Sequence, residues 1–259
     1  MQLDRITPLI LTYNEDLNIS RTLDTLRWAK RIIVIDSYST DATLDILSHY
    51  PSVTLYQHPF ESFAGQCNFG LTCISTEWTL SLDADYQVSA AFITEIQSLT
   101  ETITSDGFKV ALRYCVFGYP LRSTLLPPRT VLYRTAKAHY IEDGHAHRVR
   151  IDGPVASLRG PINHDDRKPL SHWLWAQNRY MVLEVQKLST TPGHELSLAD
   201  KIRKTKILAP FVVLFYCLIL KGGILDGWHG WYYALQRVLV EMLLAIHLIE
   251  ADLKPTEKI

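Results

Sequence analysis

The first 85 residues alternate short apolar runs with amphipathic stretches, and this alternation limits the possible folds more than any other feature of the chain. Residues 32–35 are all β-branched, which is typical of a strand buried on both faces. Further strands are expected at residues 6–11, 53–56 and 78–85, with helical spacing of apolar residues between them. Strands and helices in this order predict an α/β fold, in which a mostly parallel sheet is flanked by helices in a Rossmann-like, nucleotide-binding arrangement.

Polar clusters follow three of these runs, at the strand ends where an open parallel sheet binds its ligands. They are Thr12-Tyr13-Asn14-Glu15, the segment from Asp36 and Ser37 to Asp41, and Asp83-Ala84-Asp85. Asp83 and Asp85 share one side of a strand because alternate residues point the same way. Two neighbouring carboxylates repel each other unless a cation lies near them. This cluster therefore predicts a site for Mg²⁺ or Mn²⁺, with a solvated turn as the alternative.

The predicted secondary structure changes at two further points, near residues 107 and 166. Residues 107–165 indicate an α+β extension of the same domain, with strands at 107–116 and 130–134 and a hairpin turn at Asp152-Gly153. From residue 166 the pattern is helical. We therefore predict two domains, residues 1–165 and residues 166–259. The first is acidic, while the second carries 12 Lys and Arg against 9 Asp and Glu.

The helical region contains an apolar segment of unusual length. Residues 207–220 carry no charge, and the segment before them contributes Lys201, Arg203, Lys204 and Lys206. A spanning helix needs about 20 apolar residues, so this segment is short. We predict an interfacial membrane anchor in which the cations face anionic headgroups. Buried core helices and a transmembrane hairpin are the alternatives.

Several classes of protein lack support in the sequence. Acidic and basic residues nearly cancel, at 27 against 26, so a nucleic-acid partner is not expected. The four cysteines form no C-x-x-C pair, and the first residues lack a signal-peptide pattern, which favours a cytosolic origin. The signatures of dinucleotide binding, P-loop hydrolysis, zinc proteolysis and α/β-hydrolase chemistry are absent from the sequence.

The three polar clusters, in this order and at this spacing, resemble the N-terminal half of family 2 glycosyltransferases, which have the GT-A fold. That family usually has glycine where this chain has Tyr38. Residues 63–70 look like the family's helix that carries a glycine and an asparagine near the nucleotide. Residues 142–145, 163–171 and 221–237 resemble the bacterial branch that includes lipopolysaccharide-core glycosyltransferases.

The resemblance implies transfer of a sugar, with inversion, from a nucleotide sugar to a hydroxyl of a membrane-linked glycan or lipopolysaccharide-core acceptor. By family habit the donor is a UDP-sugar, and the enzyme is peripheral at the cytoplasmic face of the bacterial inner membrane. The residues carried over for donor binding are Thr12, Tyr13, Asn14, Glu15, Asp36, Ser37, Gly65, Gln66, Asn68, Asp83 and Arg167. Those for the divalent cation are Asp85 and Asp83. His164, beside Asp165 and Asp166, is predicted as an additional metal or diphosphate contact because imidazole is a versatile ligand, with a solvated or packed histidine as the alternative. The implied base is Asp143, with Glu142 as the alternate.

Elementary chemistry agrees with these assignments. A sugar hydroxyl is a poor nucleophile, so a positioned carboxylate takes its proton as the new bond forms. A divalent ion stabilises the charge that develops on a leaving diphosphate. Two alternatives stay open. A haloacid-dehalogenase-like phosphotransferase would use Asp83 as nucleophile, but it expects Thr or Val where this chain has Gln87. The other is a catalytically inactive, membrane-associated module that binds nucleotide sugars.

Overall fold

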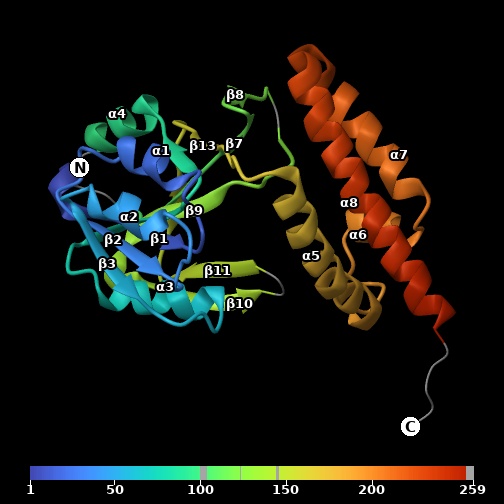
Figure 1. Ribbon diagram of the computed structural model, residues 1–259, viewed down its shortest axis with the longest axis horizontal. Helices are drawn as coiled ribbons and strands as arrows, with labels where there is room; N and C mark the ends of the chain where they lie inside the picture. The colour runs from blue at the N-terminus through green and yellow to red at the C-terminus, as the bar shows by residue number, and fades with distance from the viewer. Residues whose placement is uncertain (100–103, 123, 144–145, 255–259) are drawn as a thin grey trace, which may run out of the picture. The chain divides into compact units, whose positions relative to one another are not determined.

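The computed structural model describes residues 1–99, 104–122, 124–143 and 146–254. It divides into two compact units (Figure 1). The first, here called the sheet unit, comprises Met1–Pro120 and Leu126–Arg167. The second, here called the helical unit, comprises Leu121–Leu125 and Lys168–Ile259. Each unit is described by itself.

A seven-stranded sheet with the order β12-β6-β9-β4-β1-β2-β3 forms the centre of the sheet unit. Its strands are β1 Ile6–Thr12, β2 Ile32–Asp36, β3 Val53–Gln57, β4 Trp78–Asp83, β6 Gly107–Val110, β9 Arg129–Arg134 and β12 Val155–Ser157. The first four strands are mutually parallel, and β9 runs antiparallel to β4 and β6. The predicted mostly parallel α/β sheet is therefore confirmed.

Both faces of this sheet are buried, as the β-branched runs predict. Ile10 and Val34 belong to the core on one face, whereas Leu9 and Ile35 belong to the core on the other. The covering helices are α1 Ile19–Asp24, α2 Thr43–Ser48, α3 Phe63–Thr72 and α4 Ala90–Ser98. Helix α3 approaches the sheet closely at Gly70, where a Cβ atom would lie 2.5 Å from Leu9 Cδ1.

Two smaller sheets complete the unit. One has the order β5-β13-β7-β8, and the other pairs β10 with β11. Their strands are β5 Tyr86–Val88, β7 Leu112–Val116, β8 Tyr119–Pro120, β10 Ala138–Asp143, β11 Ala146–Ile151 and β13 Ile162–His164. Two 3₁₀ turns, Leu3–Arg5 and Thr135–Lys137, precede β1 and β10.

The predicted hairpin turn at Asp152-Gly153 is wrong. Strand β11 pairs with β10, whereas β12, which follows the turn, pairs in parallel with β6. The backbone N–H of Asp152 donates to the carbonyl of Lys137, and Gly153 has φ +145°. These residues therefore carry the chain out of one sheet and into the other.

The helical unit contains α5 Leu170–Thr190, α6 Leu198–Lys204, α7 Leu208–Phe215, a π-helical segment Tyr216–Leu220, a 3₁₀ turn Gly223–Asp226 and α8 Gly227–Leu253. Its core contains Met181 and Leu188 of α5 and Leu244 of α8. In the described part of the chain, no single helix has the length and apolar composition to cross a membrane. The pair Leu208–Leu220 and Gly223–Leu253, bent by 69°, meets those criteria only when taken together.

Candidate functional site

The ends of β1 and β2 meet at one edge of the large sheet. Asp36, which is completely buried, accepts hydrogen bonds from Thr12 Oγ1 at 3.0 Å and from the Ser39 hydroxyl at 2.5 Å. The Ser39 backbone N–H also donates to the Asp36 carboxylate, at 2.9 Å. The structure thus brings Thr12 and Asp36 together, as expected from parallel strands that end at the same edge.

The loops after these strands are tied to each other. The backbone N–H of Asn14 donates to Ser39 Oγ at 2.9 Å, and Asn14 Oδ1 accepts the backbone N–H of Thr40 at 2.8 Å. The backbone N–H of Glu15 donates to Thr43 Oγ1 at 2.8 Å. The edge is therefore held in place before any ligand binds.

Tyr38, where the family usually has glycine, has a left-handed backbone conformation in the loop after β2. Its φ of +60° lies in the left-handed region, which explains why glycine is usual at this position in the family. For a residue with a Cβ atom, this backbone conformation is about 1–2 kcal/mol less favourable than the right-handed one. The tyrosine ring is 51% exposed, and that of Tyr13 is 56% exposed. Backbone strain of this kind is often found at functional sites. In the sequence, the replacement of the usual glycine by Tyr38 is the one sign of this strained position.

Helix α3 supplies polar side chains that hold neighbouring segments. Gln66 donates to Ser37 Oγ at 2.7 Å and to the His58 carbonyl at 2.9 Å. Asn68 donates to the Tyr140 carbonyl at 3.0 Å and accepts the Tyr140 backbone N–H at 2.8 Å. Asn68 thereby fixes β10, the strand that ends in Glu142 and Asp143. The backbone N–H of Gly65 donates to Ser62 Oγ at 3.1 Å, in the first turn of α3.

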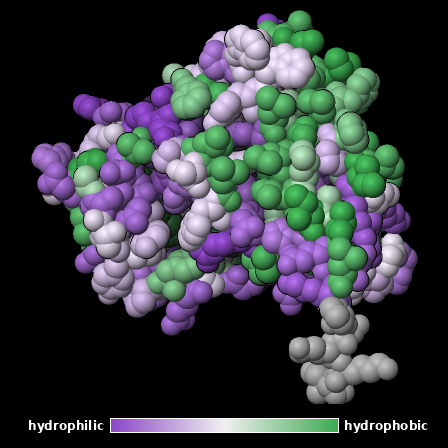
Figure 2. Space-filling view, turned by 45° about the vertical axis from the view of Figure 1, so that its right-hand side comes forward, coloured by the Kyte–Doolittle hydropathy of each residue, from purple (hydrophilic) through white to green (hydrophobic). Residues whose placement is uncertain are grey.

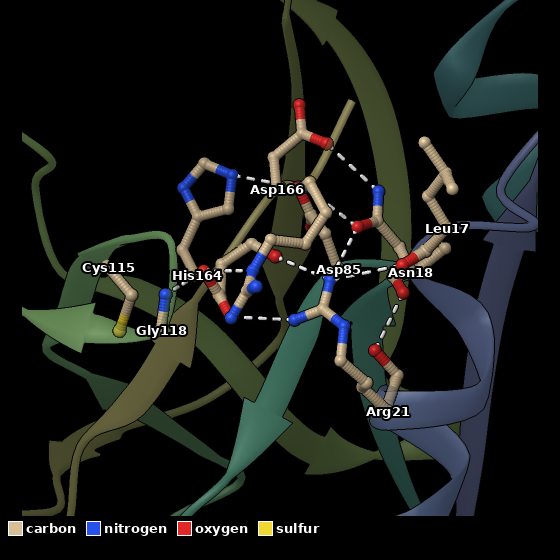
Figure 3. Close-up of polar contacts among 12 residues, drawn as sticks. Leu17, Asn18, Arg21, Asp85, Cys115, Gly118, His164 and Asp166 are labelled. Atoms are coloured by element: carbon tan, nitrogen blue, oxygen red, sulfur yellow. Dashed lines mark hydrogen bonds and ion pairs between the residues drawn. The ribbon is translucent and has the colours of Figure 1, made fainter. Parts of the chain in front are cut away.

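Asp83 and Asp85 bind different cationic side chains. Arg129 Nη1 donates to Asp83 Oδ2 and to the Tyr86 hydroxyl, each at 2.8 Å. Asp85 Oδ2 lies 2.9 Å from His164 Nε2 (Figure 3). Burial alone lowers the pKa of His164, but the Asp85 carboxylate outweighs burial and raises this pKa to about 8. Sequence reasoning found His164 but missed Arg129, which no motif marked.

The side chains around Asp85 fit a divalent cation. Asp85 Oδ1 and His164 Nδ1 are buried and have no hydrogen-bond partner. A buried carboxylate oxygen without a partner is costly, and a hard cation would satisfy it. Among the residues that the structure describes, no three metal-ligating side chains gather into a site by themselves. An ion held here would therefore take further ligands from water or from a substrate phosphate, which is common for Mg²⁺.

The segment after His164 is anchored by a buried carboxylate. Asp165 accepts hydrogen bonds from Arg21 Nη1 at 2.7 Å, Arg167 Nη2 at 2.8 Å and the backbone N–H of Gly118 at 3.0 Å. Burial raises the pKa of Asp165, but these donors outweigh burial and leave the pKa below its usual value. Arg167, which the resemblance assigns to the donor, is thus also the partner of an internal carboxylate.

Asn18 connects this segment to the loop after β1. It donates to Glu15 Oε2 at 2.8 Å and to Asp166 Oδ1 at 2.9 Å (Figure 3). Its Oδ1 accepts the backbone N–H of Arg167 at 2.9 Å. Sequence reasoning missed Asn18, because a single asparagine in a helical stretch gives no signal of a contact across almost 150 residues.

The expected base lies partly outside the described residues. The backbone of β10 reaches Asp143, but the Asp143 side chain is outside the part of the structure that is described. Glu142 is exposed. Burial raises the pKa of the Cys67 thiol to about 12, and the charges of Asp83 and Glu142 both contribute to this rise.

Comparisons with known proteins agree with this arrangement. The model of the family described as Glycosyl transferase family 2 matches residues 9–148. The lipopolysaccharide core biosynthesis glycosyltransferase LpsC of Rhizobium meliloti (strain 1021) is 25% identical over 194 residues, which cover 70% of this chain and 71% of LpsC. An uncharacterized glycosyltransferase of Rickettsia bellii (strain RML369-C) is 30% identical over 105 residues, which cover 40% of this chain and 35% of that protein.

A solved structure also resembles the fold of this chain, over almost the whole length of the chain. The mannosyltransferase PcManGT of Pyrobaculum calidifontis, solved with GDP-Man and Mn²⁺, superimposes with a TM-score of 0.54. The match covers 98% of this chain and 89% of that chain at 12% identity, so it concerns the fold alone. The expected GT-A fold is confirmed. Since the family model covers more than half of the sequence, the chain belongs to glycosyl transferase family 2.

Proposed function

We propose that the protein transfers a sugar, with inversion, from a nucleotide sugar to a hydroxyl of a membrane-linked glycan or lipopolysaccharide-core acceptor. The relative LpsC, named for lipopolysaccharide core biosynthesis, supports this choice of acceptor. The observation that carries the proposal is the site after β4, where Asp85 Oδ2 lies 2.9 Å from His164 Nε2 and the buried Asp85 Oδ1 has no hydrogen-bond partner. Such an acceptor places the enzyme at the cytoplasmic face of the bacterial inner membrane, as a peripheral protein on an anionic surface.

The donor is proposed to bind at the ends of β1, β2 and β4, and we propose a UDP-sugar. Asp36 is buried, and its hydrogen bonds with Thr12 and Ser39 hold together the ends of the two strands where we propose that the donor binds. The exposed ring of Tyr13 is available for stacking on the base. The complete proposed set is Thr12, Tyr13, Asn14, Glu15, Asp36, Ser37, Gly65, Gln66, Asn68, Asp83 and Arg167.

Asp85 and His164, with Asp83, are proposed to hold Mg²⁺ or Mn²⁺. When bound, such an ion stabilises the negative charge that develops on the departing diphosphate. Arg129 holds the Asp83 carboxylate in a fixed position through an ion pair at 2.8 Å. Arg129 is itself fixed by the Tyr86 hydroxyl, so its charge stays beside the donor site.

The transfer step needs a base on the acceptor side. The acceptor oxygen forms a bond to the anomeric carbon while the bond from that carbon to the diphosphate oxygen breaks. The proton of the acceptor hydroxyl passes to a carboxylate oxygen of Asp143, or of Glu142 as the alternative. Asn68 positions the strand that carries both residues.

Substituting Asp143→Asn is expected to lower kcat by a factor of about 10²–10⁴, the usual contribution of a general base. KM for the donor should change little, because the amide keeps the shape of the side chain. Steady-state kinetics with the matched variant Glu142→Gln check this assignment. Normal turnover in Asp143→Asn, together with a large loss in Glu142→Gln, would show that Glu142 is the base.

A screen of nucleotide sugars tests the proposed reaction as a whole. UDP-sugars are expected to raise the melting temperature in the presence of Mn²⁺ and to do so much less in its absence, because a ligand that binds only the folded state stabilises it. GDP-sugars serve as the comparison. The purified protein should also hydrolyse its donor slowly. A donor that binds without hydrolysis or transfer would support the inactive module instead.

A further inference from the structure

The outward side of α7 and of the following π-helical segment is apolar along its whole length. Six of its residues are between 44% and 67% exposed: Leu208, Phe211, Val212, Phe215, Ile219 and Leu220. Such a stripe normally faces the core of a soluble protein. Here Ala209, Cys217 and Leu218, on the other side of the same segment, are buried instead.

Helix α8 extends this surface. A groove of about 330 Å³ lies between α7 and α8, and Phe211, Met242 and Ile246 are among the residues that line it. Trp228, at the start of α8, is 86% exposed. Figure 2 shows hydrophobic residues gathered in a continuous band over one side of the molecule. We call the six side chains of α7 and the π-helical segment, together with Trp228, Met242 and Ile246, the apolar face.

Three basic residues near the apolar segment have partners within the helical unit. Arg203 Nη2 lies 3.0 Å from Glu241 Oε1, and the Glu241 side chain is only 5% exposed. Arg203, whose side chain is 32% exposed, is thus paired with a buried carboxylate and does not form a free surface cluster with the neighbouring lysines. Lys206 precedes the apolar segment and also pairs with Asp252. Lys221 follows the segment, with its Nζ 5.5 Å from the centre of the Tyr216 ring.

We propose that the apolar face inserts into the headgroup region of an anionic phospholipid bilayer, with α7 lying in the plane of the membrane. This inference rests on the proposed function, because it would bring the enzyme to a lipid-linked acceptor. Apolar residues bounded by lysines and accompanied by an exposed tryptophan match the chemistry of an anionic interface. The 14 residues 207–220 reach about 21 Å as a helix, against about 30 Å for the hydrocarbon core.

The pattern of exposure favours an in-plane position. One side of the segment packs against α8, and only the opposite side exposes apolar side chains that lipid could cover. The lysines at its ends also argue against a second copy as the occupant. Two faces related by a twofold axis would bring Lys206 or Lys221 of one copy close to a lysine of the other.

Flotation of the full chain with lipid vesicles tests this inference. Wild-type protein is expected to float with vesicles of phosphatidylcholine and phosphatidylglycerol, and more weakly with phosphatidylcholine alone. The double variant Phe211→Ser/Phe215→Ser should reduce the partition coefficient at least about tenfold. The matched control is Val182→Ser/Leu183→Ser, which changes two apolar side chains of α5 that are 54% and 44% exposed. This control should bind like the wild type.

The outcomes separate this inference from the proposed function. Equal flotation of wild type and the Phe211/Phe215 variant would overturn the inference, and so would a wild type that does not float. A wild-type dimer in sedimentation that the same variant converts to a monomer would assign the face to a second copy. Stabilisation by the nucleotide sugar and Mn²⁺ should be unchanged in both variants. Loss of that response in the wild type itself would refute the proposed function and not the membrane contact.

Discussion

Replacing Asp85 by alanine is expected to lower kcat about 10²–10³-fold, the scale seen when a group that stabilises transition-state charge is removed. The same change should abolish the rise in melting temperature that Mn²⁺ causes in the absence of donor. Both effects follow from the buried Asp85 Oδ1, which has no hydrogen-bond partner, and from the contact of Oδ2 with His164. Kinetics and thermal unfolding with and without Mn²⁺ measure the two effects separately.

Asp83→Asn is the matched control for Asp85. Asp83 binds Arg129 at 2.8 Å, and its side chain is 43% exposed against 16% for Asp85. The Asp83 variant should therefore lose less of the response to Mn²⁺ than Asp85→Ala does, and it should also lose affinity for the donor. A response to Mn²⁺ in Asp85→Ala equal to that of the wild type would contradict the proposed cation site. Full transfer by the wild type in excess chelator would contradict it as well.

The large sheet and its functional edge could be predicted because their causes are local. A run of β-branched residues forms a strand buried on both faces wherever it occurs, and parallel strands must end at one edge. The polar clusters after β1, β2 and β4 therefore fall together without knowledge of any long-range contact. The contact between Thr12 and Asp36 is a direct result.

The partners of the site carboxylates could not be predicted in the same way. Arg129 begins β9, which runs antiparallel to β4, and the strand that carries His164 belongs to a different sheet. Their positions depend on strand pairings over long sequence distances, which no local pattern specifies. The failed hairpin at Asp152-Gly153 has the same origin, because the turn residues allowed a pairing that the neighbouring strands did not use.

For the helical unit, amino-acid composition does not predict which side of each helix is buried. The sequence indicates that residues 207–220 are apolar and that four cations lie close before them, but not which side of each helix faces the core. In the folded unit, Arg203 pairs with the buried carboxylate of Glu241. Phe211 and Phe215 are exposed to solvent. The exposed apolar side is visible only in the assembled unit.

Replacing Asp165 by alanine is expected to destabilise the sheet unit by about 1–3 kcal/mol, which is typical when the buried partner of hydrogen-bonded donors is removed. The Asp165 side chain is 3% exposed, and its loss leaves Arg21, Arg167 and the Gly118 N–H without their acceptor. Asp165→Asn should cost less, because an amide oxygen still accepts a hydrogen bond but carries no charge. Urea denaturation, followed by a signal from the sheet unit, measures the differences.

A matched control shows why burial decides the size of this effect. Asp24 and Arg27 also form an ion pair, at 2.7 Å, but their side chains are 48% and 77% exposed. Exposed pairs contribute little, because water already solvates both charges. Asp24→Ala should therefore unfold at the same urea concentration as the wild type. If Asp165→Ala did so too, the two arginines would have to find other acceptors, and the segment that carries His164 would not depend on Asp165 for its position.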